Sequence, residues 1–418
     1  MVTLINYMDR MTISVLVDDI QRSLHLTDKD YSEIISLFFV AYAIMYAVSG
    51  YVVDRLGTRL GMALFVCVWS VSQIAHSLAN GKWSFTACRF GLGLAEPGSF
   101  PAATKAIGEW FPIEQRALGV GIFNAGSSIG AAAAAPVTAF LALQYGWRAA
   151  FIFTGALGLI WMTFWLIIYE SPQRNRWLSK SEAAVITSAL PVVEVPNLKQ
   201  PVNWLGVISS RAGVMLILAR FLTDPVIYFV IFWLPHYLEK ERGFDLAMIG
   251  KYAWVPYMFG GVGYLFGGWL AGEMLRAGWT TSRARKTTMT VGAAFLPVAI
   301  MAPFVPSWGL AISAMCAVVM GHSIWISNLM TLPTDLFTPH EVGTASGLSG
   351  MGGAIGGALA NWFTGSIIAH FSYAPIFICA GLLHPIAVLL VWVFLPQRTF
   401  ERTTTPRSGV SEAVPDFQ

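Results

Sequence analysis

Long hydrophobic stretches recur along the whole chain, and short polar segments separate them. A helix that crosses a bilayer needs about 20 predominantly apolar residues, because the hydrocarbon core is about 30 Å thick. Stretches of this kind lie near residues 1–20, 32–53, 60–79, 84–107, 118–141, 149–169, 212–238, 250–274, 288–305, 309–332, 343–369 and 372–395. The pattern predicts an all-α polytopic membrane protein of about twelve transmembrane helices.

The composition supports this interpretation. Of the 418 residues, 56% are hydrophobic and 12% are charged, whereas soluble globular proteins carry about 25% charged residues. A water-soluble chain of this composition would expose apolar patches large enough to cause aggregation. The net charge is only +3 and no basic stripe contains interleaved aromatic residues, so we expect no nucleic-acid partner. The four cysteines lie in apolar stretches without metal-ligand spacing, which argues against a metal site.

The longest polar interruption, residues 170–211, divides the chain into two halves. We interpret residues 1–169 as an N-terminal six-helix bundle and residues 212–395 as a C-terminal six-helix bundle, joined by a cytoplasmic loop. Residues 396–418 are polar, and we expect a disordered cytoplasmic tail. The domain organisation is therefore two similar bundles of transmembrane helices.

A shared glycine pattern suggests that the halves are repeats. Residues 111–134 and 337–360 align at a constant offset of 226, which pairs Gly126 with Gly352 and Gly130 with Gly356. Duplicated halves around a central site are a recurring design of transporters. Chance similarity between two Gly- and Ala-rich segments is the alternative. Small residues four apart let helices approach closely, so we assign these glycines packing or hinge roles.

Lysine and arginine residues indicate the orientation, because they accumulate in cytoplasmic loops. With the N-terminus inside, the inner loops and the C-terminal tail hold most of them. We therefore expect a monomer in the inner (plasma) membrane, in contact with lipid, with both termini in the cytoplasm. Only about 12 Å of helix separates Met1 from Asp9, and we expect a first helix shortened at its N-terminal end.

Four charged residues fall within predicted spans: Asp9 and Arg10 in the first, and Arg89 and Glu96 in the fourth. A charge at membrane depth costs about 2.5–3.5 kcal/mol on insertion scales. Arg89 and Glu96 are two helical turns apart and should share a face. The Pro- and Gly-rich residues 97–101 should distort the fourth span directly after Glu96.

These charges favour a central polar cavity that carries an organic anion. A guanidinium offers a fork of donors that matches a carboxylate. A buried carboxyl group near an arginine can gain and lose a proton, which a proton-coupled carrier requires. The alternative is two ion pairs that only hold the helices together.

Other polar residues within the spans could line the same cavity, although each could also form a helix–helix hydrogen bond. They are Tyr7, Asn124, Ser127, Ser128, His322, Trp325, Asn328 and Asn361. Tyr7 and Asn328 are the ones we favour for a ligand that bears several hydroxyls. Arg220 and Asp224 are four apart in the seventh span, and we interpret them as a structural or gating pair.

Residues 50–61, GYVVDRLGTRLG, resemble the loop signature between the second and third spans of the major facilitator superfamily. The resemblance implies that Asp54, Arg55 and Arg59 form inter-helix contacts that stabilise one facing of the carrier. The corresponding segment of the second half, residues 267–278, lacks the expected aspartate.

More narrowly, the chain resembles the anion:cation symporter family and its hexuronate branch. The resemblance lies in residues 5–10, 89–112, 121–130, 221–238, 278–286 and 321–337. It implies symport of a sugar acid with protons, in which Asp9 and Glu96 are protonated and Arg89 couples to them. It also implies that Arg10 holds the substrate carboxylate and that Tyr7 lies near the ligand. Some relatives have a glutamine where this chain has Ser127.

We therefore predict a transporter of a hexuronate or related sugar acid, with H⁺ as coupling ion and no other cofactor. Carriers of other organic anions are the first alternative, including aldonates, glucarate-like or tartrate-like diacids and aromatic acids. A passive facilitator or channel is the second alternative. An integral membrane enzyme is disfavoured, because no nucleophile elbow or phosphate-cradling loop occurs.

Overall fold

The computed structural model of the chain describes residues 1–110, 113–172, 204–337 and 341–395, and a few positions between 172 and 204. Some side chains within these ranges, including those of residues 113–121, lie outside the description. The described residues form helices and no strands. The tail predicted at residues 396–418 lies outside the described residues.

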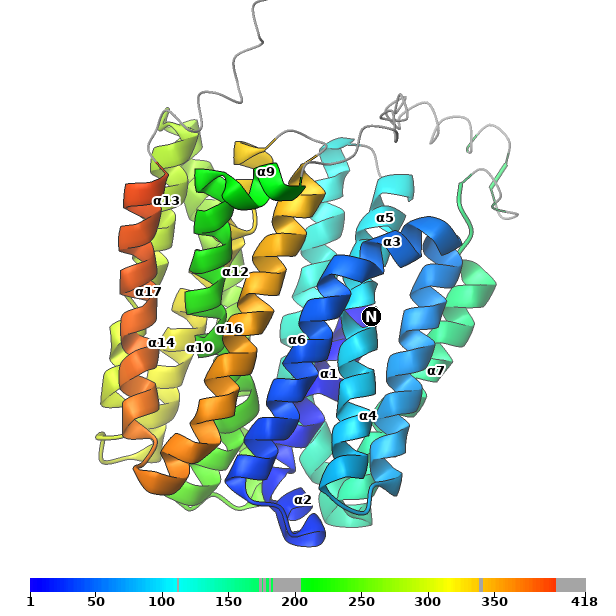
Figure 1. Ribbon diagram of the computed structural model, residues 1–418, viewed down its shortest axis with the longest axis vertical. Coiled ribbons are helices and arrows are strands. Elements are labelled where there is room, and N and C mark those ends of the chain that lie inside the picture. Colours follow the sequence, from blue (N-terminus) through cyan, green and yellow to red (C-terminus); the bar gives the residue numbers. More distant parts are fainter. Residues whose placement is uncertain are drawn as a thin grey trace, which may run out of the picture.

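Two bundles of helices stand side by side (Figure 1). The N-terminal half consists of α1 (Val2–Val15), α2 (Val17–Leu24), α3 (Asp28–Ala75), η1 (His76–Leu78), α4 (Lys82–Ala95), η2 (Glu96–Gly98), α5 (Ser99–Trp110), α6 (Ile113–Tyr145) and α7 (Trp147–Ile168). The C-terminal half consists of α9 (Trp204–Ser209), α10 (Arg211–Arg242), α11 (Leu246–Tyr252), α12 (Val255–Arg276), α13 (Thr281–Ala293), η3 (Leu296–Met301), α14 (Trp308–Leu329), α15 (Leu332–Leu336), α16 (Val342–His370) and α17 (Ala374–Phe394).

Six helical segments in the described part are long and apolar enough to cross a membrane without interruption. They are Arg55–Leu78, Ile122–Tyr145, Trp147–Ile168, Arg211–Arg242, Trp308–Leu329 and Ala374–Phe394. Several other predicted spans are divided into shorter helices. The first span is split between α1 and α2, and the fourth changes to a 3₁₀ turn at Glu96–Gly98, as the Pro- and Gly-rich sequence predicts.

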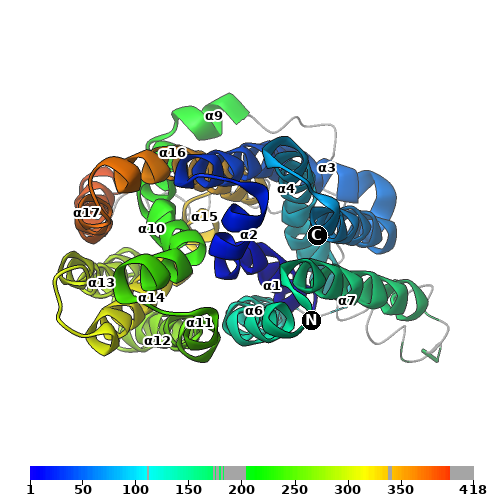
Figure 2. The same cartoon turned by 90° about the horizontal axis from the view of Figure 1, so that it is seen from below.

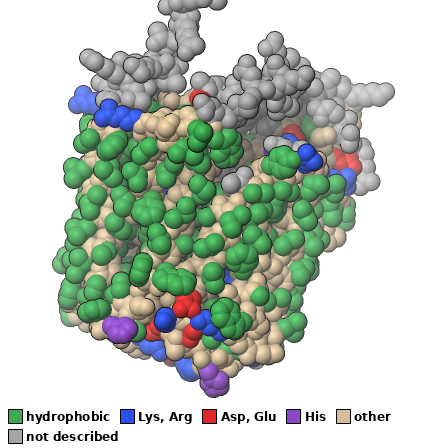
Figure 3. Space-filling view, viewed as in Figure 1, with side chains coloured by type: hydrophobic (Ala, Val, Ile, Leu, Met, Phe, Trp, Pro, Cys, Tyr) green, Lys and Arg blue, Asp and Glu red, His purple; other side chains and the backbone are tan. Residues whose placement is uncertain are grey.

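Helix α3 contains two successive spans that meet at Gly57. The backbone there has a φ of 76°, in the left-handed region that favours glycine. On the face shown in Figure 3, hydrophobic side chains cover much of the surface between the two ends, and charged side chains gather toward the ends. This distribution fits a molecule whose sides contact lipid and whose ends contact water.

In the described part, several pairs of helices join the two halves. Helix α3 packs against α16, α6 packs against α11 and α12, and α1 packs against α10. Figure 2, seen from below, shows α1, α2 and α10 near the centre, between the two bundles. The two bundles therefore enclose the space around α1 and α10.

Ion pairs close the end of the molecule that holds α2. In the described part, every ion pair between the halves lies at this end. The pairs are Asp18–Lys240 (2.8 Å) and Arg22–Glu239 (2.9 Å). The His236 imidazole also lies 3.3 Å from the Asp28 carboxyl group and 3.4 Å from that of Asp18. The Tyr31 hydroxyl also donates to the Phe232 carbonyl at 2.7 Å. These contacts join the two bundles at the α2 end.

The glycine repeat corresponds to two equivalent helix contacts. Gly130 of α6 packs on Leu4 of α1, and Gly356 of α16 packs on Phe221 of α10. A Cβ atom at either glycine would lie 2.2 Å from the carbonyl oxygen of its neighbour. The sequence match at an offset of 226 thus reflects the same close approach in both halves, which argues against a chance resemblance.

We expect Gly130→Ala and Gly356→Ala each to lower stability, because the added methyl group would overlap a backbone carbonyl. Overpacking of this kind costs about 1–3 kcal/mol. Thermal unfolding of the purified protein in detergent should show a melting temperature several degrees lower. Gly268→Ala is the matched control, because a Cβ at this position meets no atom within 4 Å. Equal melting temperatures for all three variants would contradict the packing role.

Candidate functional site

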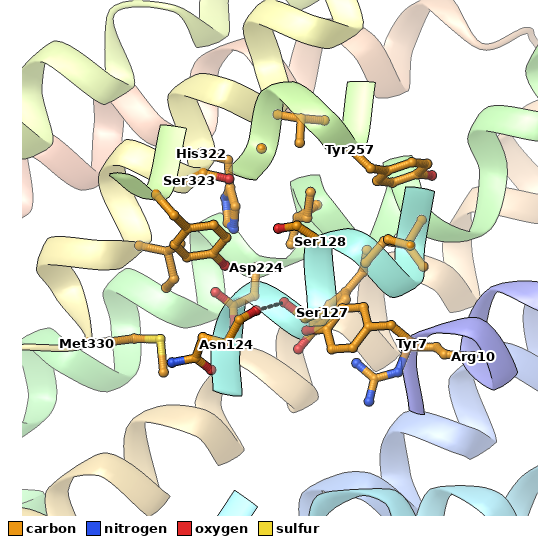
Figure 4. Close-up of a pocket in the computed structure, with 18 of the residues that line it drawn as sticks. Tyr7, Arg10, Asn124, Ser127, Ser128, Asp224, Tyr257, His322, Ser323 and Met330 are labelled. Carbon is orange, nitrogen blue, oxygen red and sulfur yellow. Dashed lines mark hydrogen bonds between the residues drawn. The ribbon is translucent and has the colours of Figure 1, made fainter. Parts of the chain in front are cut away.

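A cavity of about 130 Å³ lies between the two halves (Figure 4). By the same kind of measure one water needs about 10–15 Å³, so the space is large enough for several waters. Its polar lining comprises Tyr7, Arg10, Tyr42, Tyr46, Asn124, Ser127, Ser128, Arg220, Asp224, Tyr228, Tyr257, Tyr264, His322 and Ser323. These residues come from α1, α3 and α6 of the first half and from α10, α12 and α14 of the second.

Arg10 is the charged residue of α1 that faces this cavity. Its Nε and Nη2 donate to the same Glu96 oxygen, Oε2, at 2.8 and 2.5 Å, and Nη2 also donates to the Tyr42 hydroxyl at 3.0 Å. The guanidinium carbon lies 4.8 Å from the Tyr7 ring centre and 4.9 Å from that of Tyr42. Nη1 has no hydrogen bond to any described residue. One edge of the guanidinium is therefore occupied, and one nitrogen remains free to bind a ligand.

Glu96 reaches Arg10 from the distorted turn of the fourth span. Its side chain is fully buried, and Oε1 has no hydrogen-bond partner among the described residues. Arg89, two turns earlier, is also buried, and its Nη2 donates to the backbone carbonyl of Arg10 at 2.8 Å. Both residues contact Arg10, as the prediction of a shared face requires.

Arg89 differs from Arg10 in having no carboxylate within ion-pair distance in the described part. Its guanidinium carbon lies 4.7 Å from the centre of the Phe38 ring and 5.8 Å from that of Phe232. Its Nε and Nη1 are buried without partners. Since Phe232 belongs to α10, Arg89 is a positive charge held at the interface of the two halves.

The expectation that Asp9 joins this cavity is wrong. Successive residues of an α-helix point about 100° apart, and α1 turns Arg10 toward the cavity and Asp9 away from it. Asp9 is buried among α1, α3 and α7, where Gln73 bridges the Asp9 backbone carbonyl (3.3 Å) and the Thr154 hydroxyl (3.0 Å). Neither oxygen of its carboxyl group has a hydrogen bond to a described residue.

Asn328 also does not line the cavity, contrary to the prediction. Its amide nitrogen donates to the carbonyl of Gly267 on α12 and to that of Ile324, both at 3.2 Å. Its oxygen accepts from Arg285 at 3.4 Å. The side chain therefore ties α14 to α12. Trp325 and Asn361 are likewise absent from the lining and bond to neighbouring helices.

Tyr7 and Ser127, by contrast, face the cavity as predicted, together with Asn124, Ser128 and His322. The Ser127 hydroxyl donates to the Asn124 carbonyl at 2.6 Å, within its own helix (Figure 4). These side chains supply hydrogen-bonding groups close to Arg10.

Of the three predicted gating residues, Asp54 has a side chain outside the described part of the structure. Arg55 is exposed, and its guanidinium lies 5.1 Å from the Tyr51 ring centre. Arg59 donates to the carbonyl of Leu166 and approaches Glu170 at 3.8 Å. These described contacts remain within the N-terminal half, and the gating role stays a prediction.

The sequence correctly predicts that Arg220 and Asp224 pair, but not that they line the cavity. Their i, i+4 spacing fixes a common helix face without showing which neighbour that face meets. The described residues contain no group of three or more His, Cys, Asp or Glu side chains that could hold a metal ion.

Two helical bundles around a buried, charged cavity define a membrane transport protein of the two-bundle class. The family model of the Major Facilitator Superfamily matches residues 1–361 and 274–414, and the chain belongs to this superfamily. It is thus a multi-pass membrane transporter and not an enzyme, which confirms the predicted fold class.

Individual relatives agree with this assignment. The hexuronate transporter of Escherichia coli (strain K12) is 31% identical over 397 residues, which cover 95% of this chain and 92% of that protein. The galacturonate transporter of Dickeya chrysanthemi is 35% identical over 269 residues, or 64% of this chain and 78% of that protein. The inward open xylose transporter XylE from E. coli shares the fold, with a TM-score of 0.76, 16% identity and coverage of 96% and 97% of the two chains.

We expect Asn328→Ala to destabilise the protein, because it leaves buried partners on α12 and α14 unsatisfied. Such a loss costs about 1–3 kcal/mol, and the melting temperature in detergent should fall. Ser127→Ala is the control, since its hydroxyl bonds only within α6 and faces the cavity. A melting temperature for Asn328→Ala that equals that of Ser127→Ala would contradict the structural role.

Proposed function

We propose that the protein is a proton-coupled symporter of an organic anion, a hexuronate or related sugar acid, that works by alternating access. The proposal rests on the arrangement of Arg10 and Glu96. Arg10 faces the cavity, and Glu96 occupies the Nε/Nη2 edge of the Arg10 guanidinium. That edge is the part of a guanidinium that binds a carboxylate best.

The chemistry of the cavity supports a sugar acid. Arg10 provides a site for a carboxylate, and the surrounding tyrosine, serine and asparagine side chains provide donors and acceptors for hydroxyl groups. Tyrosine rings also offer apolar faces for the C–H groups of a sugar. The names of the relatives, a hexuronate and a galacturonate transporter, point to the same class of substrate.

Competition for Arg10 supplies the coupling to protons. While Glu96 is ionised, it neutralises Arg10 and takes the place of the substrate carboxylate. Protonation of Glu96 releases the guanidinium, and the incoming anion then restores the charge balance. The anion and one proton enter the site together, so that the net charge around Arg10 does not change, and a change of buried charge is costly in a membrane protein.

Asp9 has a related role in this proposal. A buried carboxylate without any partner would cost several kcal/mol, whereas a neutral carboxyl group at this position would not. We propose that Asp9 carries a proton in the state described here and that Arg89 links it to Glu96 through their common contact with α1.

The closed end of the molecule defines a step of the transport cycle. In the orientation favoured by the Lys and Arg residues, both termini face the cytoplasm and the α2 end faces outward. The contacts of Asp18, Arg22 and Asp28 with α10 would then close the cavity to the outside of the inner membrane. Because the cavity is complete within one chain, we propose that a monomer surrounded by lipid is the working unit.

Arg10→Ala should abolish saturable uptake of glucuronate and galacturonate into proteoliposomes with an imposed pH gradient. The reason is that the substrate carboxylate loses its guanidinium. Arg276→Ala is the control, because this arginine is exposed and pairs only with Glu273 in the described part. A panel of aldonates, diacids and aromatic acids, used as competitors, defines the substrate range. Wild-type uptake by Arg10→Ala would overturn the assignment, and non-saturable uptake by the wild type would indicate a channel.

Glu96→Gln should bind substrate but lose accumulation driven by the pH gradient, because glutamine leaves Arg10 free at all pH values. Equilibrium exchange of labelled for unlabelled substrate should persist in this variant. Glu273→Gln, at the surface, should behave as the wild type. Full proton-driven accumulation by Glu96→Gln would show that Glu96 is not a coupling residue.

A further inference from the structure

The central cavity contains a second guanidinium–carboxylate pair, on the opposite bundle from Arg10. Arg220 and Asp224 of α10 line the cavity. Nε and Nη2 of Arg220 contact Asp224 Oδ2 at 2.8 and 2.6 Å. The side chain of Arg220 is 13% exposed and that of Asp224 is 3% exposed. Thus each bundle contributes one Arg–carboxylate pair at the same cavity.

The pair leaves hydrogen-bonding capacity unused. Both nitrogen contacts of Arg220 go to one oxygen of Asp224, whereas the other oxygen, Oδ1, has no partner among the described residues. Nη1 of Arg220 has no hydrogen bond in the described part either. Arg–carboxylate pairs frequently use both carboxylate oxygens in a fork, whereas this pair uses one. One acceptor and one donor therefore remain available beside the cavity.

The charges of the two bundles differ around the cavity. On the N-terminal side, Arg10 and the unpaired Arg89 face a single ionised partner, Glu96, because Asp9 is neutral in the proposed function. On the C-terminal side, Arg220 is balanced by Asp224. A carboxylate is therefore attracted to the N-terminal side. A neutral group that both donates and accepts hydrogen bonds fits the C-terminal side.

We propose that Arg220 and Asp224 bind the hydroxyl-bearing end of the sugar acid, with Asp224 Oδ1 accepting from one hydroxyl and Arg220 Nη1 donating to a neighbouring one. This inference rests on the proposed function. A hydroxyl is both donor and acceptor, so a diol matches a carboxylate and a guanidinium side by side. A second carboxylate at this position would be repelled by Asp224. The substrate then bridges the bundles, with its acid end on Arg10 and its hydroxyls on α10.

Binding to the full-length protein in detergent, measured by calorimetry, tests this assignment with two probes. Glucuronate carries a carboxylate and several hydroxyls, and cyclohexanecarboxylate carries the carboxylate alone. Asp224→Asn and Arg220→Gln should weaken glucuronate binding by about 10- to 100-fold, the range for hydrogen bonds to a charged group. Binding of cyclohexanecarboxylate should be unchanged. Glu273→Gln, which alters the exposed Glu273–Arg276 pair, should leave both affinities at their wild-type values.

Three results would overturn the assignment. If the variants bound glucuronate with unchanged affinity but exchanged substrate more slowly, Arg220 and Asp224 would be a gating pair and not a binding site. Loss of galactarate binding in Arg220→Gln, with glucuronate binding kept, would make Arg220 a site for a second carboxylate. An equal loss of affinity for both probes would indicate a general structural effect.

If the neutral variants fail to fold, Asp224→Glu and Arg220→Lys provide a second test, because they keep the charges but move the groups. These variants should lower the affinity for glucuronate alone. Failure of the wild type to bind any sugar acid would instead overturn the proposed function itself.

Discussion

The buried guanidinium of Arg10 is the constraint on which the rest of the site depends. A counter-charge and a polar cavity both stabilise a charge in the middle of a helical bundle, and Arg10 has both. Glu96 supplies the counter-charge, and the distorted turn Glu96–Gly98 presents it to Arg10. The cavity supplies the polar surroundings. An anionic ligand can replace the Glu96 carboxylate on Arg10 only when Glu96 is neutralised by a proton. Anion binding and proton binding are therefore coupled in the proposed mechanism.

The repeated architecture places this constraint between two similar halves. The Gly130 and Gly356 contacts bring α6 onto α1 and α16 onto α10, so the two helices that carry the arginines occupy equivalent positions. Closure at the α2 end combines a few ion pairs with apolar packing, because buried side chains of α2 and α10 belong to one hydrophobic core. Polar contacts of this kind can exchange for water when the bundles move. The structure thus combines close packing within each half with both polar and apolar contacts between the halves.

Much of this arrangement follows from the sequence. The apolar stretches and the two-half division predict the fold, and the seven-residue spacing of Arg89 and Glu96 predicts that they share a helix face. Asp9 was misplaced because the sequence does not show how much of the α1 surface the cavity reaches: it includes Arg10 but not the neighbouring residue, about 100° away. Asn328 and Asp224 illustrate a different limit. Their helices were predicted, but the neighbour that each helix face meets depends on packing between distant segments, which one sequence does not reveal.

Proton uptake on substrate binding tests the central claim most directly. In weakly buffered detergent solution near neutral pH, addition of glucuronate to the wild-type protein should remove about one proton per bound ligand from the solution, because Glu96 must be protonated to release Arg10. Glu96→Gln should bind glucuronate without taking up a proton. Binding to the wild type without proton uptake, or equal uptake by both proteins, would contradict the competition of Glu96 and substrate for Arg10.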